Sequence, residues 1–234
     1  MSNLFPPTAN RTFYRILGVL GALVILLLGG IYLQHFSGMA YEPQQPIQFS
    51  HKVHVGTLKM DCTYCHSTAE HSKTAGMPDT QSCMGCHTHI LPDSPLIAPL
   101  RRAADPTYEH YTGEPVAWVM VNRLAAHAYF NHQAHVTRGV ACVECHGDVS
   151  EMDVISADKN SKMRWCMDCH RNPSNSLRPL PFVTIPKWSW EKYLQSSDLK
   201  DEQGLPIQTR EGLGKWLQHE WNIKPKTDCT TCHH

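Results

Sequence analysis

All ten cysteines of this 234-residue sequence fall into five copies of one pattern, Cys-x-x-Cys-His. The copies read CTYCH at 62–66, CMGCH at 83–87, CVECH at 142–146, CMDCH at 166–170 and CTTCH at 229–233. Two thiols at this spacing can form thioether bonds to the two vinyl groups of one porphyrin, and the adjacent histidine can bind the iron. The pattern therefore predicts five covalently attached c-type hemes.

Each copy supplies two attachment sites and one iron ligand. We expect covalent attachment at Cys62, Cys65, Cys83, Cys86, Cys142, Cys145, Cys166, Cys169, Cys229 and Cys232. The proximal iron ligands are then His66, His87, His146, His170 and His233. Zinc sites and disulfides also use paired cysteines, but neither explains a histidine at the same offset five times.

Two pairs of further histidines precede the first and third copies, in FSHKVH at 49–54 and FNHQAH at 130–135. A low-spin heme iron takes a second axial ligand, usually histidine or methionine. Histidines three residues apart share a helical face but cannot both bind one iron, so each pair should serve two hemes. The predicted distal ligands are His51, His54, His132 and His135.

The fifth distal ligand stays open at this point. The candidates that we retain are Met163, Met152 and His110, and a methionine would raise the potential of its heme above that of bis-histidine neighbours. Other histidines outside the motifs are also available, namely His71, His89, His127, His219 and His234.

Residues 49–87 and 130–170 form a duplicated pair of units, each with two motifs. Strand signals are few, and 171–186 is punctuated by prolines. The stretches KWSWEKYLQSS and TREGLGKWLQHEWN have the pattern of short amphipathic helices. We expect a domain that is mainly coil with short α-helices around five stacked hemes, without which the polypeptide would not fold.

The N-terminal end has the pattern of a membrane anchor. Residues 16–33 are an uninterrupted, largely apolar run, long enough to cross the hydrocarbon core. Arg11 and Arg15 precede this run, which places the N-terminus in the cytoplasm by the positive-inside rule. A signal peptide cleaved after Ala40 is the alternative. The expected segments are a cytoplasmic N-terminus (1–12), a transmembrane helix (13–35), a linker (36–48) and an extracytoplasmic pentaheme domain (49–234).

Lysines plus arginines equal aspartates plus glutamates, at 21 each, so no basic excess suggests nucleic-acid binding. The Phe-x-His-x-x-His element resembles that of multiheme cytochromes of the c3 and c7 type. This resemblance implies that His51 binds the heme on Cys62 and Cys65, and that His132 binds the heme on Cys142 and Cys145. His54 and His135 would then bind other hemes.

A narrower resemblance covers roughly residues 47–174, on the strings CTYCH, GMPDTQSCMGCH, YFNHQAHVTRGVACVECHG and MRWCMDCHRNP. With five motifs and one N-terminal anchor, the sequence resembles the pentaheme c-type cytochrome subunit of bacterial alternative complex III, a quinol:electron acceptor oxidoreductase. The resemblance assigns no ligand role to His71 or His127.

The resemblance implies an electron-transfer subunit without its own substrate site, in the bacterial inner membrane of a respiratory or photosynthetic chain. Its implied partners are an iron–sulfur subunit related to molybdopterin enzymes, integral quinol-binding subunits, and a periplasmic acceptor such as a monoheme cytochrome, a copper protein or an oxidase. The alternative is the tetraheme type of membrane quinol dehydrogenase that partners nitrite reductase. A multiheme enzyme would need an iron with an open coordination site.

Overall fold

The computed structural model describes residues 7–37, 41–159 and 161–233. Residues 1–6 of the expected N-terminal segment, 38–40 of the expected linker, and His234 lie outside this part. The chain divides into two compact units, Met1–Ala40 and Tyr41–His234. The first contains α1 (Pro7–Ser37).

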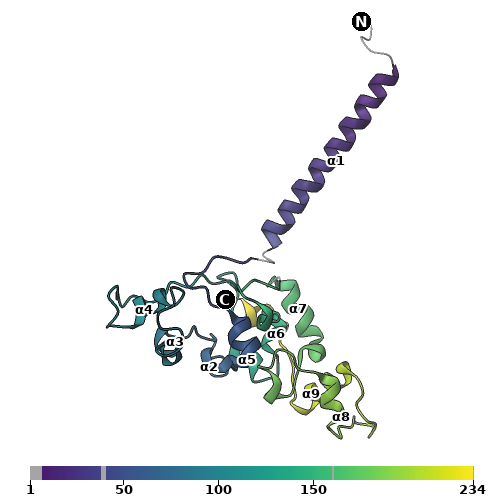
Figure 1. The fold of residues 1–234 in the computed structure, drawn as a ribbon. Coiled ribbons are helices and arrows are strands. Elements are labelled where there is room, and N and C mark those ends of the chain that lie inside the picture. Colours follow the sequence, from purple (N-terminus) through teal and green to yellow (C-terminus); the bar gives the residue numbers. More distant parts are fainter. Residues whose placement is uncertain (1–6, 38–40, 160, 234) are drawn as a thin grey trace. The chain divides into compact units, whose positions relative to one another are not determined.

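The second unit contains short helices joined by coil (Figure 1). Its α-helices are α2 (Cys62–Cys65), α3 (Thr80–His87), α4 (Ala98–Ala104), α5 (His132–Val136), α6 (Cys142–His146), α7 (Met163–Arg171), α8 (Trp190–Gln195), α9 (Arg210–Glu220) and α10 (Cys229–Cys232). A π-helix, η1 (Lys52–Thr57), and the 3-10 turns η2 (Val149–Glu151), η3 (Pro173–Ser176) and η4 (Leu180–Phe182) complete it. In the described residues, β-pairing is limited to isolated bridges, so the expected mainly coil fold is confirmed.

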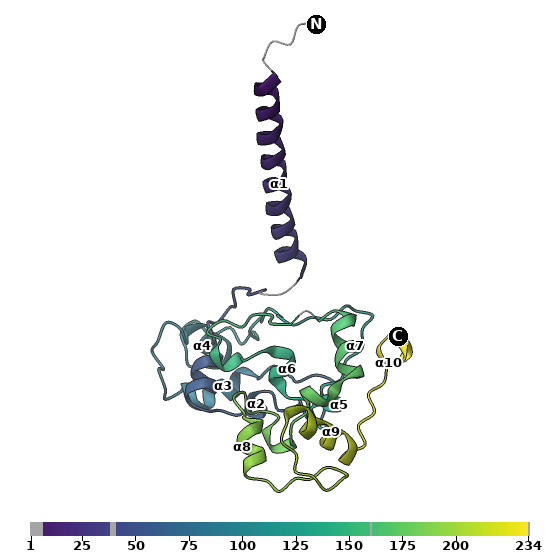
Figure 2. The same ribbon diagram turned by 90° about the vertical axis from the view of Figure 1, so that its right-hand side faces the viewer.

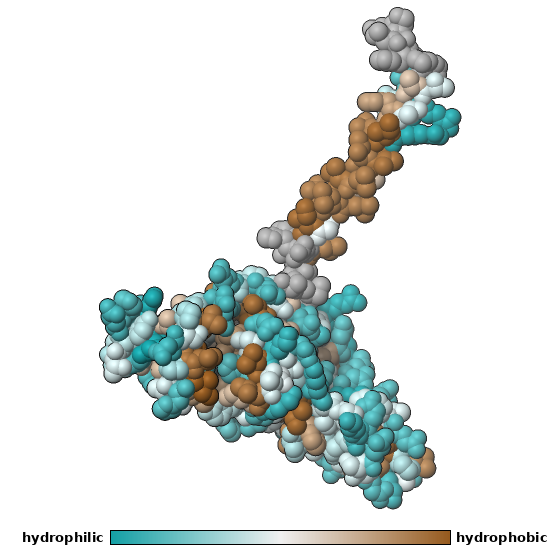
Figure 3. Space-filling model, viewed as in Figure 1, coloured by the Kyte–Doolittle hydropathy of each residue, from teal (hydrophilic) through white to brown (hydrophobic). Residues whose placement is uncertain are grey.

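Helix α1 contains the stretch Thr8–Leu33, which is long and apolar enough to cross a membrane. Its apolar side chains from Phe13 to Leu33 are exposed, and they form a hydrophobic surface along the helix (Figure 3). A helix with this length and composition is suited to a bilayer, although a signal sequence would meet the same description.

Each Cys-x-x-Cys-His motif forms one short helix, and an aspartate caps three of the five. Asp61, Asp79 and Asp228 each accept a hydrogen bond from a backbone N–H in the first helical turn. Such a side chain satisfies a donor that the helix itself leaves free. One helical turn also brings residues i and i+3 to the same face, as two cysteines that bind one porphyrin require.

Two small clusters of buried apolar side chains are found among the described residues of the second unit. One contains Met84, Ile97, Leu100 and Ala104. The other surrounds Leu177, Leu213 and Leu217, with tryptophans of α8 and α9 packed against them. Gly214 of α9 lies directly on the backbone of Ser174, leaving no room for a Cβ atom. Among the described residues, α3 contributes Met84 and Cys83 to the first cluster, and the other four motif helices contribute to neither cluster.

Candidate heme-binding sites

Phe49 and Phe130 hold the paired histidines of the two duplicated units in the same geometry. Phe49 meets His51 edge-on, with ring centroids 4.9 Å apart, and stacks on His54 at 4.3 Å. Phe130 meets His132 edge-on at 4.8 Å and stacks on His135 at 4.5 Å. The two units therefore share one arrangement, in which a phenylalanine ring contacts two imidazole rings and fixes their planes.

Three of these histidines face a motif histidine. The ring centroids lie 6.2 Å apart for His54 and His87, 6.4 Å for His132 and His146, and 6.0 Å for His135 and His170. Metal–imidazole bonds of about 2 Å on both sides of one ion place the ring centres roughly 6 Å apart. The spacing of these ring pairs thus fits an iron between them.

His51 lies among histidines of the first and third motifs. Burial, followed by the charges of His66, His54 and His146, lowers the pKa of His51 to about 4. Burial and the charges of His132 and His66 likewise lower the pKa of His146 to about 4. Both rings are therefore neutral at physiological pH, which is the form that binds a metal. Among the described residues, Nδ1 of His51 is a buried nitrogen without a hydrogen-bond partner.

His127 is the residue that faces the fifth motif histidine. The centroids of the His127 and His233 rings lie 5.5 Å apart, and the ring planes are inclined by 29°. The three retained candidates lie elsewhere: His110 packs edge-on against Tyr108, Met163 is an exposed residue at the start of α7, and the Met152 sulfur accepts a hydrogen bond from Ser156. No repeated motif in the sequence marks His127, because the corresponding position before Phe49 is Pro46.

Backbone carbonyls fix which nitrogen of each ring is free. Nδ1 lies 2.6–3.1 Å from a backbone oxygen in His54, His66, His87, His132, His135, His170 and His233. A carbonyl only accepts, so Nδ1 carries the hydrogen in each of these rings. Nε2 is then left with a free lone pair, as iron ligation requires.

Asn122 takes the place of a carbonyl at the remaining motif histidine. Its amide nitrogen lies 3.0 Å from Nδ1 of His146. Turning the amide by 180° presents its oxygen, which can accept the Nδ1 hydrogen. Asn122 belongs to the segment between the duplicated units, and no motif in the sequence marked it.

The two cysteines of each motif lie three residues apart on one helix, so both can reach the same porphyrin. Burial raises the pKa of Cys145 to about 12, and burial also raises the pKa values of Cys65, Cys83 and Cys166. In the part of the chain that the structure describes, no three His, Cys, Asp or Glu side chains converge as ligands of a single metal ion. The donor set fits heme, which needs two thiols on one helical face and two opposed imidazoles.

The family described as cytochrome c7 and related cytochrome c matches residues 47–95 and 128–234. This chain belongs to the cytochrome c7 family. The matched ranges contain all five motifs and both pairs of histidines, so the chain is a multiheme c-type cytochrome. Asn122 and His127 lie just outside the matched ranges.

A relative of this cytochrome supports the same conclusion. The multiheme cytochrome c subunit of menaquinone reductase from Nitratidesulfovibrio vulgaris is 32% identical over 176 residues. These residues make up 65% of this chain and 80% of the relative. The similarity therefore extends over most of the length of both proteins.

Proposed function

We propose that this cytochrome holds five c-type hemes and relays electrons along them as a subunit of a membrane-bound quinol oxidoreductase. The observation that carries the proposal is the repeated placement of a second imidazole opposite a motif histidine. Four such ring pairs have centroids 5.5–6.4 Å apart. A second imidazole at every iron makes an electron carrier, because it occupies the position that a substrate would need.

The proposed ligand sets follow from these neighbours. The distal ligand is His51 for the heme of the first motif, His54 for the second, His132 for the third, His135 for the fourth and His127 for the fifth. The electrostatic contact between His51 and His66 supports the first assignment, and the ring pairs support the others. The pairings of His51 and His132 are those that the resemblance to c3 and c7 cytochromes implies.

The polypeptide contributes position and electrostatics rather than bond-making. When bound, each heme iron supplies a one-electron redox couple whose potential depends on its axial ligands and surroundings. The phenylalanines hold the distal rings, and the carbonyl partners keep Nε2 of each ring available. We therefore propose that the chain has no substrate site of its own.

The complex we propose is of the alternative complex III type. Its expected partners are an iron–sulfur subunit, integral quinol-binding subunits and a periplasmic electron acceptor. The relative from Nitratidesulfovibrio vulgaris is a subunit of menaquinone reductase, which supports membership of an assembly for this chain. In this proposal α1 is a single-pass anchor in the inner membrane, with Arg11 and Arg15 on the cytoplasmic side.

The name of the relative also favours a second candidate function, in which electrons flow toward the quinone. A menaquinone reductase delivers electrons to menaquinone, whereas alternative complex III takes them from quinol. The same row of hemes could work in either direction, since the driving force depends on the donor and the acceptor. The third possibility is the tetraheme quinol dehydrogenase type, which would act without an iron–sulfur subunit.

Purification of the full chain in mild detergent tests the proposal. We expect an iron–sulfur subunit and a multispanning subunit to copurify, and anaerobic addition of quinol to reduce the hemes, as seen in the visible absorption band. If the prereduced complex reduces added quinone but quinol does not reduce the hemes, the result would favour the reductase direction. Recovery of the chain alone, or with a soluble nitrite reductase, would contradict the proposed complex.

A further inference from the structure

We infer that the five motifs follow one another in space in the order second, first, third, fourth, fifth, so that their hemes form one unbranched row. This inference rests on the proposed function, since it concerns the same hemes. The order differs from that of the sequence at one point, where the first and second motifs exchange places. It makes the second and fifth motifs the two ends of the row.

The first link joins the second motif to the first through His51 and His54. Phe49 touches both rings, so these two histidines are neighbours in space. His54 faces His87 of the second motif, and His51 interacts electrostatically with His66 of the first. Two rings held by one phenylalanine thus lead to two different motifs. The sulfurs of Cys65 and Cys86 also lie close enough to interact.

The second link joins the first motif to the third, although the second motif lies between them in the sequence. The side chains of Cys62 and Cys142 lie close enough for each thiol to shift the pKa of the other. Both also meet the same short stretch of backbone: Sγ of Cys62 donates to the carbonyl of Thr184 at 3.3 Å, and the N–H of Cys142 donates to that of Val183 at 3.2 Å. In the loaded protein these sulfurs carry thioether bonds, so the attachment points of the two hemes lie next to each other.

Contacts between the π-helix and the segment after the third motif reinforce this second link. The backbone N–H of Lys52 donates to the carbonyl of Met152 at 3.0 Å, and its ammonium group pairs with Asp153 at 3.2 Å. Ser50 also donates to Asp153 at 2.9 Å. The two duplicated units are therefore joined where the first and third motifs meet.

The third link joins the third motif to the fourth through α5. Phe130 touches His132, which faces His146, and His135, which faces His170. The arrangement repeats that of the first unit. Cys145 of the third motif also interacts with Cys169 of the fourth.

The fourth link joins the fourth motif to the fifth. Nδ1 of His170 donates to the carbonyl of Lys226, 2.6 Å away, just before the last motif begins. Cys166 and Cys232 lie close enough to interact. The fifth motif also lies beside the segment before Phe130, since the N–H of Tyr129 donates to the carbonyl of Cys232 at 2.8 Å.

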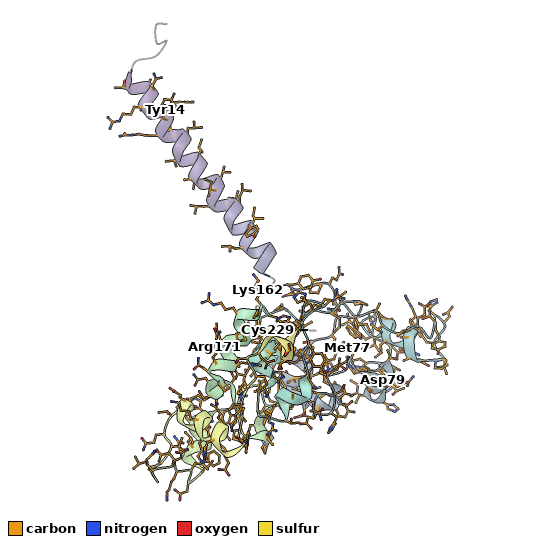
Figure 4. All side chains as sticks on the ribbon, turned by 180° about the vertical axis from the view of Figure 1, so that it is seen from behind. Tyr14, Met77, Asp79, Lys162, Arg171 and Cys229 are labelled. Atoms are coloured by element: carbon orange, nitrogen blue, oxygen red, sulfur yellow. The ribbon has the colours of Figure 1, made fainter. Side chains whose placement is uncertain are left out.

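Figure 2 and the exposure of the sulfurs support the second and fifth motifs as the two ends of the row. Figure 2 shows α3, α2, α6, α7 and α10 in that order from left to right. Figure 4 labels Asp79, the cap of α3, on one side of the unit and Arg171, the last residue of α7, toward the other. Cys86 and Cys229 are exposed, whereas the other eight motif cysteines are partly buried. Exposed attachment points at the second and fifth motifs suit the exchange of electrons with partners.

Proton NOE spectra of the heme-loaded full chain test the order. Low-spin ferrous hemes are diamagnetic, so the protein is held in detergent micelles and fully reduced with dithionite. Each heme is assigned to its motif through contacts of its thioether protons with isotope-labelled cysteines. We expect heme-to-heme cross peaks between the second and first, first and third, third and fourth, and fourth and fifth motifs. A cross peak between the hemes of the second and third motifs, or the absence of one between the hemes of the first and third, would overturn the order.

Variants at the ends and in the middle give a second readout. In His54→Met and His127→Met, the axial methyl group marks the altered heme, and resonances of only one neighbouring heme should shift. His132→Met should shift those of two neighbours, and His71→Met, at an exposed histidine, should produce no axial methyl resonance. Two shifted neighbours in an end variant would overturn the order. Fewer than five hemes on the chain would instead contradict the proposed function, which keeps the two failures distinct.

Discussion

The imidazole rings of His127 and His233 are neighbours, with centroids 5.5 Å apart and planes inclined by 29°. Nδ1 of His233 donates to the carbonyl of His127 at 3.1 Å, and Ala128 and His233 form a β-bridge. The chain thus returns to the segment before Phe130 to place its last motif. This pairing gives the last motif a second imidazole of its own.

His127→Met should convert the heme of the fifth motif to histidine–methionine ligation. We expect its midpoint potential to rise by roughly 0.1–0.2 V, within the ~0.8 V range that axial ligands span. A potentiometric titration monitored by visible absorption measures the shift. Met163→Leu, Met152→Leu and His110→Gln are the matched controls, and a shift of this size in one of them would contradict the assignment of His127.

Phe130→Ala should loosen both imidazoles that this ring holds. We expect a loss of about 1–3 kcal/mol in the free energy of unfolding, because two ring contacts of about 0.5–1.5 kcal/mol each are removed. The EPR spectrum should change as well, since the g values of ferric low-spin hemes depend on the angle between the axial imidazole planes. Phe182→Ala removes contacts with Trp188 and Tyr193 and should destabilise the protein without altering that spectrum. An unchanged spectrum in Phe130→Ala would contradict the role of this residue.

Substitutions at Asn122 should move the potential of the third-motif heme in opposite directions. Asn122→Asp places a carboxylate beside Nδ1 of His146, makes that ligand more basic and should lower the potential. Asn122→Leu removes the hydrogen-bond partner, should raise the potential, and should cost about 1–3 kcal/mol of stability. Redox titration of both variants, with Asn175→Leu as an exposed control, measures these changes. Shifts of the same sign in both variants would show that the amide does not act through His146.

Arg178 supports the backbone beside the first and third motifs. It is buried, pairs with Glu144 at 3.5 Å, donates to the carbonyl of Ile185 at 2.8 Å and lies over the ring of Trp188. Arg178→Met should lower the stability of the loaded protein by about 3 kcal/mol, near the lower limit for breaking a buried ion pair. Denaturant unfolding measures this loss. Arg164→Met, which removes an exposed pair with Asp168, should cost less than about 1 kcal/mol, and equal losses in the two variants would contradict the prediction.

The parts of the sites that sequence could predict are local. The spacing of the two cysteines in each motif requires one helical turn, and each motif forms such a turn. Phe49 and Phe130 stand at fixed distances from their histidines, and the resulting contacts are the same in both units. The amphipathic patterns at 187–197 and 209–222 correspond to α8 and α9.

The parts that could not be predicted depend on distant segments meeting. His127 gains its partner only because the C-terminal segment folds back beside it. Asn122 reaches His146 from an irregular segment whose course no periodicity determines. The closeness of Cys62 and Cys142 depends on the backbone at Val183 and Thr184, far along the chain from the first motif.

Intact mass analysis of the purified full chain tests the central claim most directly, because it counts the porphyrins bound to each polypeptide. We predict a single main species whose mass exceeds that of the polypeptide by five hemes. A main species with fewer hemes, or one carrying zinc or disulfides in place of hemes, would contradict the account.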